Sequence, residues 1–512
     1  MNKLLHIDIS PEDYFDKKTF ENILSKKSSI SIKKLSYRIQ KESLDCRKEP
    51  VYHLNVLVSE NNDLPTIGIE PFLNVKDSMP VIVVGAGPCG LFAALKLIQK
   101  GLKPIIIERG KPIEERKKDT AKIIRNEGIN EDSNFCFGEG GAGTFSDGKL
   151  YTRSTKKGNI DELLRLFVHF GAKQEILYQA HPHIGTDVLC RIIKNIRNEI
   201  TLHGGEYRFS TKIVNLIVKD DEIKGVKTSE GEDIMAQRVI LSTGHSAHDI
   251  YQLFYDNNWQ IEPQSFALGV RIEHPQELIN TIQYHNSHNL TILPPAEYSL
   301  TVHADQRSIH TFCMCPGGVV IPTPDKNGVM VVNGMSSSSR RGKFANSAVV
   351  VGVDLEDAKK YSDFGALSLM KLQQECEQKM YIDRCFAPAQ RMTDFLNKKE
   401  SSSLAETSYH PGLISMDLHK RLPKFVSDSL IKGLFLFDNK MKGYITQDSN
   451  LIGLESRTSS PVRISRDKTT MQHVQIKHLY PCGEGAGYAG GITSSALDGI
   501  NVANIIAKEL GV

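Results

Sequence analysis

The chain has 512 residues, with 63 lysines and arginines against 60 acidic residues, so its formal net charge is +3. Hydrophobic residues make up 40% and charged residues 24%, close to the average of globular proteins, which excludes a mostly disordered, fibrous or membrane-embedded chain. The near-neutral charge gives no reason to expect nucleic acid or an anionic membrane as the main partner.

Three features predict a cytoplasmic protein. Charged residues interrupt the N-terminal segment before an apolar stretch can form, so we expect no secretory signal. Nowhere do about 18 apolar residues follow one another, so we expect no membrane-spanning helix. The nine cysteines are odd in number and scattered, unlike a secreted disulfide framework.

Residues 1–75 are predicted to form a separate small α/β domain. Within them, Tyr52, Leu54 and Val56 alternate with other residues and fall on one face of an expected strand. This first unit contains no glycine-rich loop.

Residues 76–250 begin with a strand–helix–strand pattern. The apolar run Val81–Val84 is typical of a parallel strand that is covered on both faces. It leads into Gly85-x-Gly87-x-x-Gly90. Apolar residues at helical spacing follow and predict a helix after this turn. Gly85 permits a tight turn, Gly87 lets the backbone approach a pyrophosphate, and Gly90 lets the helix pack closely on the strand.

This turn predicts a dinucleotide site, to which we also assign Pro88 and Cys89. Glu108 ends the second strand, where a carboxylate accepts hydrogen bonds from ribose hydroxyls. An acidic residue there disfavours a 2′-phosphate, so the dinucleotide is FAD or NAD and not NADP. Arg109, the next residue, is included in the predicted site. A glycine-rich turn with an incidental acid is the alternative.

A second glycine cluster occupies positions 138, 140, 141 and 143. Glycines cost conformational entropy on folding, so we expect a ligand to require this backbone. The amides of Gly140, Gly141, Ala142 and Gly143 are therefore predicted to lie beside it. A mobile surface loop is the alternative, which the interleaved phenylalanines disfavour.

The rest of the chain continues this pattern. After a three-strand meander, a buried strand ends at Thr243 and Gly244. Residues 251–470 contain many short strands, so we expect an antiparallel sheet in a substrate or cap domain. Residues 471–512 return to strand, loop and helix and complete the nucleotide-binding domain.

The GxGxxG turn, the strand that ends at Thr243 and Gly244, and the C-terminal strand, loop and helix follow one another in this order. In this the sequence resembles the two-dinucleotide-binding-fold flavoproteins, which include glutathione reductase and the fumarate reductase flavoprotein. Longer stretches, such as SNFCFGEGGAGTFSDGKL (133–150) and PCGEGAGYAGGITSSALDGI (481–500), resemble the bacterial FAD-dependent dehydrogenases, a group with no settled substrate. The resemblance implies an α/β fold with a Rossmann-like FAD-binding domain, an antiparallel cap domain and a small N-terminal domain. It also implies bound FAD.

The C-terminal loop is predicted to hold the flavin part of FAD. Gly483 and Glu484 stand where the family usually has Gly-Asp, so Glu484 would accept from a ribityl hydroxyl. Backbone amides at Gly490, Gly491 and Ile492 would point a helix N-terminus at the flavin N1–C2=O edge, where positive potential stabilises reduced flavin. An ordinary helix cap by a hydroxyl side chain is the alternative.

We therefore predict an FAD-dependent oxidoreductase that transfers a hydride between flavin N5 and a small-molecule substrate. No second GxGxxG occurs, so NAD(P)H would dock only transiently. A non-catalytic redox sensor or interaction protein, and a flavin-dependent monooxygenase, are the alternatives.

The sequence assigns neither catalytic residues nor an oligomeric state, and it predicts no metal site. We expect Cys313 and Cys315 to be buried apolar cysteines and not a redox dithiol. Arg340 and Arg457 are expected either to form ion pairs or to bind an anionic substrate.

Overall fold

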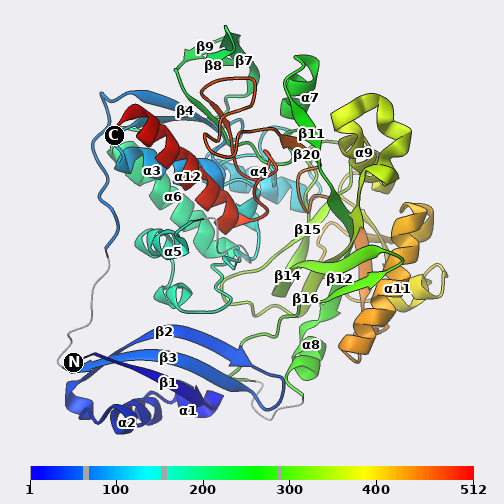
Figure 1. Ribbon diagram of the computed structural model, residues 1–512. Helices are drawn as coiled ribbons and strands as arrows, with labels where there is room; N and C mark the ends of the chain where they lie inside the picture. The colour runs from blue at the N-terminus through cyan, green and yellow to red at the C-terminus, as the bar shows by residue number, and fades with distance from the viewer. Residues whose placement is uncertain (1, 61–67, 152–157, 286–290) are drawn as a thin grey trace.

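The computed structural model describes residues 2–60, 68–151, 158–285 and 291–512. Figure 1 shows three parts. The N-terminal part is a small sheet with two helices. The middle part is a sheet covered by helices, among them the C-terminal helix, and the third part is a larger sheet with helices around it. None of the helices within those ranges is long and apolar enough to cross a membrane.

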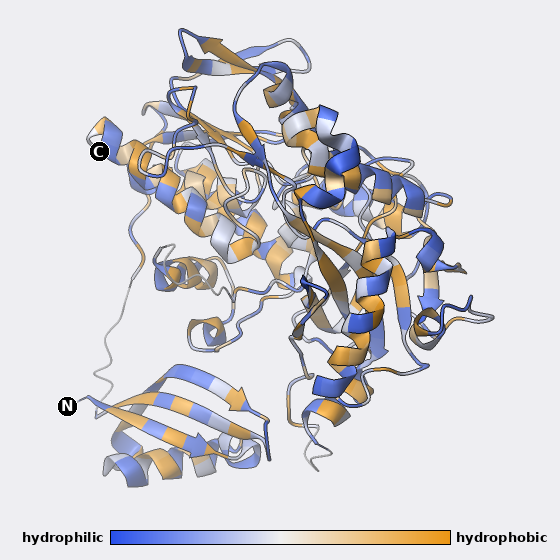
Figure 2. Cartoon of the chain, turned by 45° about the vertical axis from the view of Figure 1, so that its right-hand side comes forward, coloured by the Kyte–Doolittle hydropathy of each residue, from blue (hydrophilic) through white to orange (hydrophobic). Residues whose placement is uncertain are grey.

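The N-terminal part is a three-stranded antiparallel sheet in the order β1-β3-β2. Its elements are β1 (Lys3–Ile9), α1 (Pro11–Phe15), α2 (Lys17–Ser28), β2 (Leu35–Asp45) and β3 (Val51–Glu60). Its strands alternate between hydrophilic and hydrophobic residues (Figure 2), and the predicted set at 52, 54 and 56 is buried. Glu42 joins this sheet to the rest of the chain, because its N–H donates to Tyr178 O at 2.8 Å and its carbonyl accepts from Ala180 N–H at 2.9 Å.

The middle of the molecule is a parallel five-stranded sheet in the order β21-β10-β4-β5-β6. Its strands are β4 (Pro80–Val84), β5 (Lys103–Ile107), β6 (Glu206–Arg208), β10 (Val239–Leu241) and β21 (Leu479–Pro481). The associated helices are α3 (Pro88–Gln99), α4 (Ile113–Ile124), α5 (Ile160–His169), α6 (Thr186–Leu202), α7 (His248–Asp256) and α12 (Ile492–Leu510). The C-terminal α12 packs directly on α3: a Cβ at Gly499 would lie 2.2 Å from Cys89 O.

The predicted meander consists of β7 (Ile213–Lys219), β8 (Glu222–Thr228) and β9 (Asp233–Met235), which are antiparallel neighbours. It leads directly into β10. The first and last parts of the nucleotide-binding domain therefore meet in one sheet, as the sequence pattern predicts.

The remaining part is built on an eight-stranded sheet in the order β13-β14-β16-β12-β19-β17-β18, with β15 beside β14. Its strands are β12 (Phe266–Pro275), β13 (Thr301–Ala304), β14 (Arg307–Pro322), β15 (Val332–Met335), β16 (Phe344–Val353), β17 (Ala387–Arg391), β18 (Leu413–Ser415) and β19 (Asn450–Glu455). The helices around it are α8 (Gln276–Gln283), α9 (Ser368–Met380), α10 (Met392–Leu396) and α11 (Lys424–Lys440). A separate ribbon pairs β11 (Ile261–Pro263) with β20 (Val462–Ile464).

The predicted antiparallel sheet of this part is present, with one parallel pair at its edge. The pair β17 and β18 is parallel, so the sheet is mixed. A long connection that includes α10 separates these strands and allows the chain to return in the same direction. We refer to this part, residues 251–470, as the cap.

Candidate functional site

Four segments that are distant in sequence meet at the carboxyl edge of the parallel sheet. The Gly85–Gly90 turn follows β4 and contacts the second glycine cluster, because Gly140 N–H donates to Ala86 O at 2.8 Å. A Cβ at Gly141 would lie 2.9 Å from Gly87 Cα. In open α/β sheets, ligands bind beyond this edge of the strands.

The two other segments complete the same edge. A Cβ at Gly143 would lie 2.9 Å from Ile492 Cγ1, at the start of α12. A Cβ at Gly485 would lie 2.1 Å from the carbonyl oxygen of Thr243, which follows β10. Glycine is required at these contacts because any side chain would separate the segments.

Glu108 organises the first turn from the end of β5. Its carboxylate accepts from the N–H groups of Ala86 at 2.9 Å, Gly110 at 2.8 Å and Gly138 at 3.0 Å. Two of these amides share Oε1, and one reaches Oε2. A carboxylate offers about four acceptor positions, so Oε2 keeps one for a further donor such as a ribose hydroxyl.

Arg116 in α4 fixes the second glycine cluster. It is fully buried, and its guanidinium donates to the carbonyl groups of Asn134, Phe135, Gly138, Glu139 and Gly141. Burial lowers the pKa of Arg116 to about 10, so the group stays charged at neutral pH. This role could not be predicted from the sequence, because a basic residue in a charged helix is typical of an exposed position.

Two helix N-termini face the resulting space. Helix α3 begins after Gly87 and α12 after Gly491, and within the described chain no side chain caps either helix. Uncapped N–H groups and the helix dipole attract negative charge. The hydroxyl of Ser494, in the first turn of α12, accepts a hydrogen bond from Gly490 N–H in the preceding loop at 3.1 Å. The amide of Gly490 is therefore engaged within the loop.

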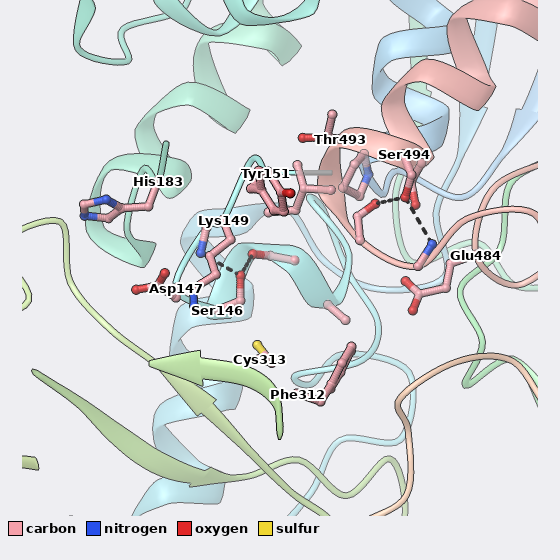
Figure 3. Close-up of a pocket in the computed structure, with 18 of the residues that line it drawn as sticks. Ser146, Asp147, Lys149, Tyr151, His183, Phe312, Cys313, Glu484, Thr493 and Ser494 are labelled. Atoms are coloured by element: carbon pink, nitrogen blue, oxygen red, sulfur yellow. Dashed lines mark hydrogen bonds between the residues drawn. The ribbon is translucent and has the colours of Figure 1, made fainter. Parts of the chain in front are cut away.

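These segments enclose one side of a cavity of about 1900 Å³. That volume is well above the roughly 300–1,000 Å³ of ordinary small-molecule pockets, so it can accept a dinucleotide and a second ligand. The opposite side comes from the cap, where Phe312 and Cys313 of β14 face the loop with Ser146 and Lys149 (Figure 3). The N-terminal domain also contributes lining residues, from 42 to 47 and at 52 and 53.

The structure brings most of the predicted cofactor residues to this cavity. Its lining includes Gly85, Gly87, Pro88, Cys89, Glu108, Arg109, Gly141, Ala142, Gly143, Thr243, Gly244, Glu484, Gly490, Gly491 and Ile492. The three other predicted residues, Gly90, Gly140 and Gly483, lie just behind the wall. A Cβ at Gly90 would lie 1.9 Å from Gly85 O, and one at Gly483 would lie 2.9 Å from Cys89 Sγ, so both allow close packing.

Burial perturbs the titratable groups of the cavity. It raises the pKa of Glu484 to about 7. It lowers the pKa of His245 to about 3, and the charge of Arg457 adds to this effect. His245 Nδ1 lies 3.6 Å from Glu484 Oε1, so at neutral pH a neutral imidazole faces a half-titrated carboxyl group. Such perturbed groups in a cavity are typical of functional sites.

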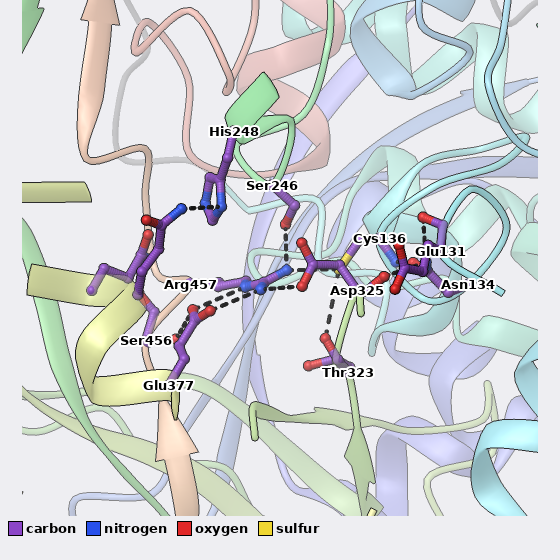
Figure 4. A network of polar contacts seen from close by, with 12 residues as sticks. Glu131, Asn134, Cys136, Ser246, His248, Thr323, Asp325, Glu377, Ser456 and Arg457 are labelled. Atoms are coloured by element: carbon purple, nitrogen blue, oxygen red, sulfur yellow. Dashed lines mark hydrogen bonds and ion pairs between the residues drawn. The ribbon is translucent and has the colours of Figure 1, made fainter. Parts of the chain in front are cut away.

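Arg340 and Arg457, for which the sequence left two interpretations, both form buried ion pairs. Arg340 pairs with Asp147 beside the cavity. Arg457 is the centre of a network in which it contacts Asp325 at 2.7 Å and Glu377 at 2.9 Å (Figure 4). These carboxylates neutralise both arginines, so neither is a free cation for an anionic substrate.

The expectation for the close cysteine pair is only half right. Cys315 is fully buried, whereas Cys313 is half-buried and lines the cavity. The difference comes from an irregularity in β14 that strand periodicity does not predict.

The parallel sheet, the three-strand meander and the large mixed sheet define an α/β flavoprotein fold. Residues 79–253 match the family described as pyridine nucleotide-disulphide oxidoreductase, and residues 265–458 match the FAD-dependent protein, C-terminal domain-like family. A protein of Clostridium beijerinckii, described as uncharacterized, is 38% identical over 99% of this chain and 98% of its own length. The chain belongs to the same family of FAD-dependent proteins as that bacterial relative.

Solved structures resemble the chain more distantly. The tetracycline destructase Tet(55) is 11% identical, with 85% of this chain and 81% of that chain covered and a TM-score of 0.38. A geranylgeranyl bacteriochlorophyll reductase-like protein of Thermoplasma acidophilum is 14% identical, with coverage of 85% and 79% and a TM-score of 0.34. Likenesses at this level give no information about function.

Proposed function

We propose that the cavity binds FAD and that the protein transfers a hydride between flavin N5 and a small-molecule substrate. The observation that supports this most strongly is the convergence of four glycine-rich segments and two uncapped helix N-termini on one cavity. A dinucleotide with a pyrophosphate and a ring that becomes anionic on reduction needs both of these sites of positive potential.

The residues present fit the cofactor. The start of α3, with Gly87 and Cys89, would hold the pyrophosphate, and the free acceptor position of Glu108 would hold the adenosine ribose. A Cβ at Gly87 would find its nearest neighbour 3.8 Å away, so the backbone there is open to close approach. At Gly490 and Gly491 a Cβ would meet nothing within 4 Å, so the start of α12 is open to the flavin ring.

When bound, FAD supplies the two-electron chemistry, and the chain's own groups control charge and protons around it. Glu484 is suited to accept from a ribityl hydroxyl. With a pKa of about 7 it also exists in both protonation states at neutral pH and can exchange a proton with a neighbouring ligand. The part of the cavity that the cap and the N-terminal domain line is left for the substrate and for a transient NAD(P)H.

Anaerobic reduction of the purified holoprotein tests this function. We expect a yellow protein whose flavin absorbance is bleached by NADH or NADPH and recovers with turnover when a quinone acceptor is added. A colourless protein that does not take up added FAD would contradict the proposal. Flavin that dithionite bleaches but no nicotinamide or acceptor affects would favour the non-catalytic alternative, and product hydroxylation coupled to oxygen consumption would favour a monooxygenase.

A further inference from the structure

The cap wall of the cavity carries two cysteines at a bulge in β14. Phe312 pairs with Ala348 and Cys315 pairs with Asn346, so one residue of β14 is extra relative to β16. Cys313, within this bulge, has a φ of +46°, a conformation that residues with a side chain rarely adopt. Cys313 therefore lies on the cavity wall, and Cys315 is buried behind it.

A buried arginine holds the bulge. Arg271 Nη2 donates to Cys313 O at 2.5 Å and lies 3.5 Å from Cys315 Sγ. The same guanidinium pairs with Glu455 Oε2 at 3.1 Å and donates to Asn346 Oδ1 at 2.8 Å. These contacts fix the backbone of the bulge and so hold both cysteines in place.

The Cys315 thiol lies beside residue 313. It donates to the Cys313 carbonyl at 3.4 Å. In Figure 3, Cys313 lies below Ser146 and Lys149, and Thr493 and Ser494 at the start of α12 lie at the upper right of the same cavity.

We propose that Cys313 and Cys315 form a redox-active dithiol whose substrate is a small disulfide. Cys313, which lines the cavity, would be the thiol that attacks, and the buried Cys315 would be the thiol that resolves. The proposal rests on the proposed function, because reduced flavin at the same site would be the two-electron donor that restores the dithiol.

The reaction consists of two thiol–disulfide exchange steps. In the first, the Cys313 thiolate attacks one substrate sulfur, the substrate S–S bond breaks, and the leaving thiolate takes a proton from solvent. In the second, Cys315 loses its proton and attacks the Cys313 sulfur, which releases the other half of the substrate as a thiol. Overall, two electrons and two protons pass from the dithiol to the substrate, and a Cys313–Cys315 disulfide remains.

An aromatic disulfide, 5,5′-dithiobis(2-nitrobenzoic acid), tests the pair directly. We expect the reduced protein to release two equivalents of thionitrobenzoate per chain in a fast phase. The protein mass should fall by two hydrogens, with no stable adduct, and the peptide that contains residues 313 and 315 should resist alkylation. A fast phase of one equivalent that leaves a stable adduct on Cys313 would overturn the proposal.

Variants separate the two roles. Cys315→Ser should release one equivalent and keep an adduct on Cys313, and Cys315→Ala should do the same, which guards against a folding defect of either. Cys313→Ser should lose the fast phase. Cys385→Ser is the matched control, a buried cysteine outside the cavity lining, and should leave both equivalents in place. Persistence of the fast phase in Cys313→Ser would overturn the proposal.

A competing thiol pair gives another way to overturn it. Cys89 Sγ and Cys482 Sγ lie 3.1 Å apart behind the pyrophosphate turn. If peptide mapping places the new disulfide there, the dithiol at β14 is wrong.

This assay distinguishes the dithiol from the proposed function, because it needs no flavin. A yellow, nicotinamide-reducible protein without the two-equivalent phase would contradict the dithiol alone. A protein that shows the phase but binds no FAD would contradict the proposed function alone. In the oxidised holoprotein, dithionite titration should require four electrons per chain, against two in Cys313→Ser.

Discussion

The two walls of the cavity are built in different ways. On the side of the parallel sheet, backbone groups form the surface: glycines at the turns and uncapped N–H groups at the starts of α3 and α12. On the cap side, side chains form it, and among them Phe312 and Cys313 come from an irregular strand. The backbone wall suits a ligand that many proteins share, and the side-chain wall suits a ligand specific to this family.

Both walls depend on one buried arginine each. Arg116 fixes the glycine cluster by donating to backbone carbonyls, and Arg271 fixes the bulge at Cys313. Arg271 has a carboxylate partner in Glu455, whereas the partners of Arg116 are mostly uncharged carbonyl groups. The same side chain therefore organises a cofactor-type surface and a substrate-type surface through different contacts.

The largest expected effect is the loss of Arg116. Arg116→Met leaves several buried carbonyl groups without a donor, so we expect a loss of about 4 kcal/mol or more in the free energy of unfolding. FAD binding should be lost with it. Urea denaturation followed by circular dichroism measures the change. Arg125→Met is the control, since Arg125 follows the same helix, is exposed and pairs with the exposed Glu127, and its loss should change stability by less than about 0.5 kcal/mol.

A smaller change isolates the backbone wall from folding. Gly87→Ala adds a methyl group whose nearest neighbour is 3.8 Å away, so the fold should tolerate it. The methyl group blocks the approach of a pyrophosphate, so FAD affinity should fall at least about tenfold, or about 1.4 kcal/mol. Fluorescence titration of flavin-free protein measures this.

The matched control for that variant is Gly68→Ala, where a Cβ meets nothing within 4 Å and which is not among the residues that line the cavity. It should leave FAD affinity unchanged. Equal affinities in Gly87→Ala and the original protein would show that the pyrophosphate does not bind at this turn.

The backbone wall could be predicted from the sequence and the side-chain wall could not, because the two are encoded differently. Gly85, Gly87, Gly90 and Glu108 stand at spacings that only a particular turn requires, so the backbone wall could be predicted before the structure. The bulge at Cys313 depends on register between β14 and β16, which are connected through β15, and no local pattern encodes a register shift. Arg116 was missed for a related reason, since its acceptors are carbonyl groups that every residue has.

The pH dependence of thiol reactivity tests the cap wall. The Cys315 thiol, followed by the charges of Arg271 and Lys149, lowers the pKa of Cys313 below its usual value, against the effect of burial. Asp147 opposes this shift, and the other charged groups of the same surroundings are Glu455 and Glu484.

Alkylation of Cys313 by iodoacetamide should therefore reach half of its maximal rate at a pH clearly below the value of about 8.5 that an ordinary cysteine shows. Mass spectrometry of the labelled peptide gives the rate at each pH. In Lys149→Met the midpoint should move upward, because a cation that favours the thiolate is gone. A midpoint near 8.5 in the original protein would show that the bulge does not activate its thiol.

The smallest expected effect concerns Glu484, which lies at the start of the loop to α12. Burial raises its pKa to about 7 in the folded protein, so the flavin-free protein should lose stability as the pH rises from about 4.5 to 7 and the carboxyl group ionises. Glu484→Gln removes that ionisation. The variant should melt a few degrees higher than the original protein at pH 8 and at the same temperature at pH 5, where the carboxyl group is largely protonated in the fold. Scanning calorimetry of both proteins, freed of flavin, measures the difference. An identical pH dependence in the two proteins would show that Glu484 is solvated, and its place in the backbone wall would then rest on cofactor contact alone.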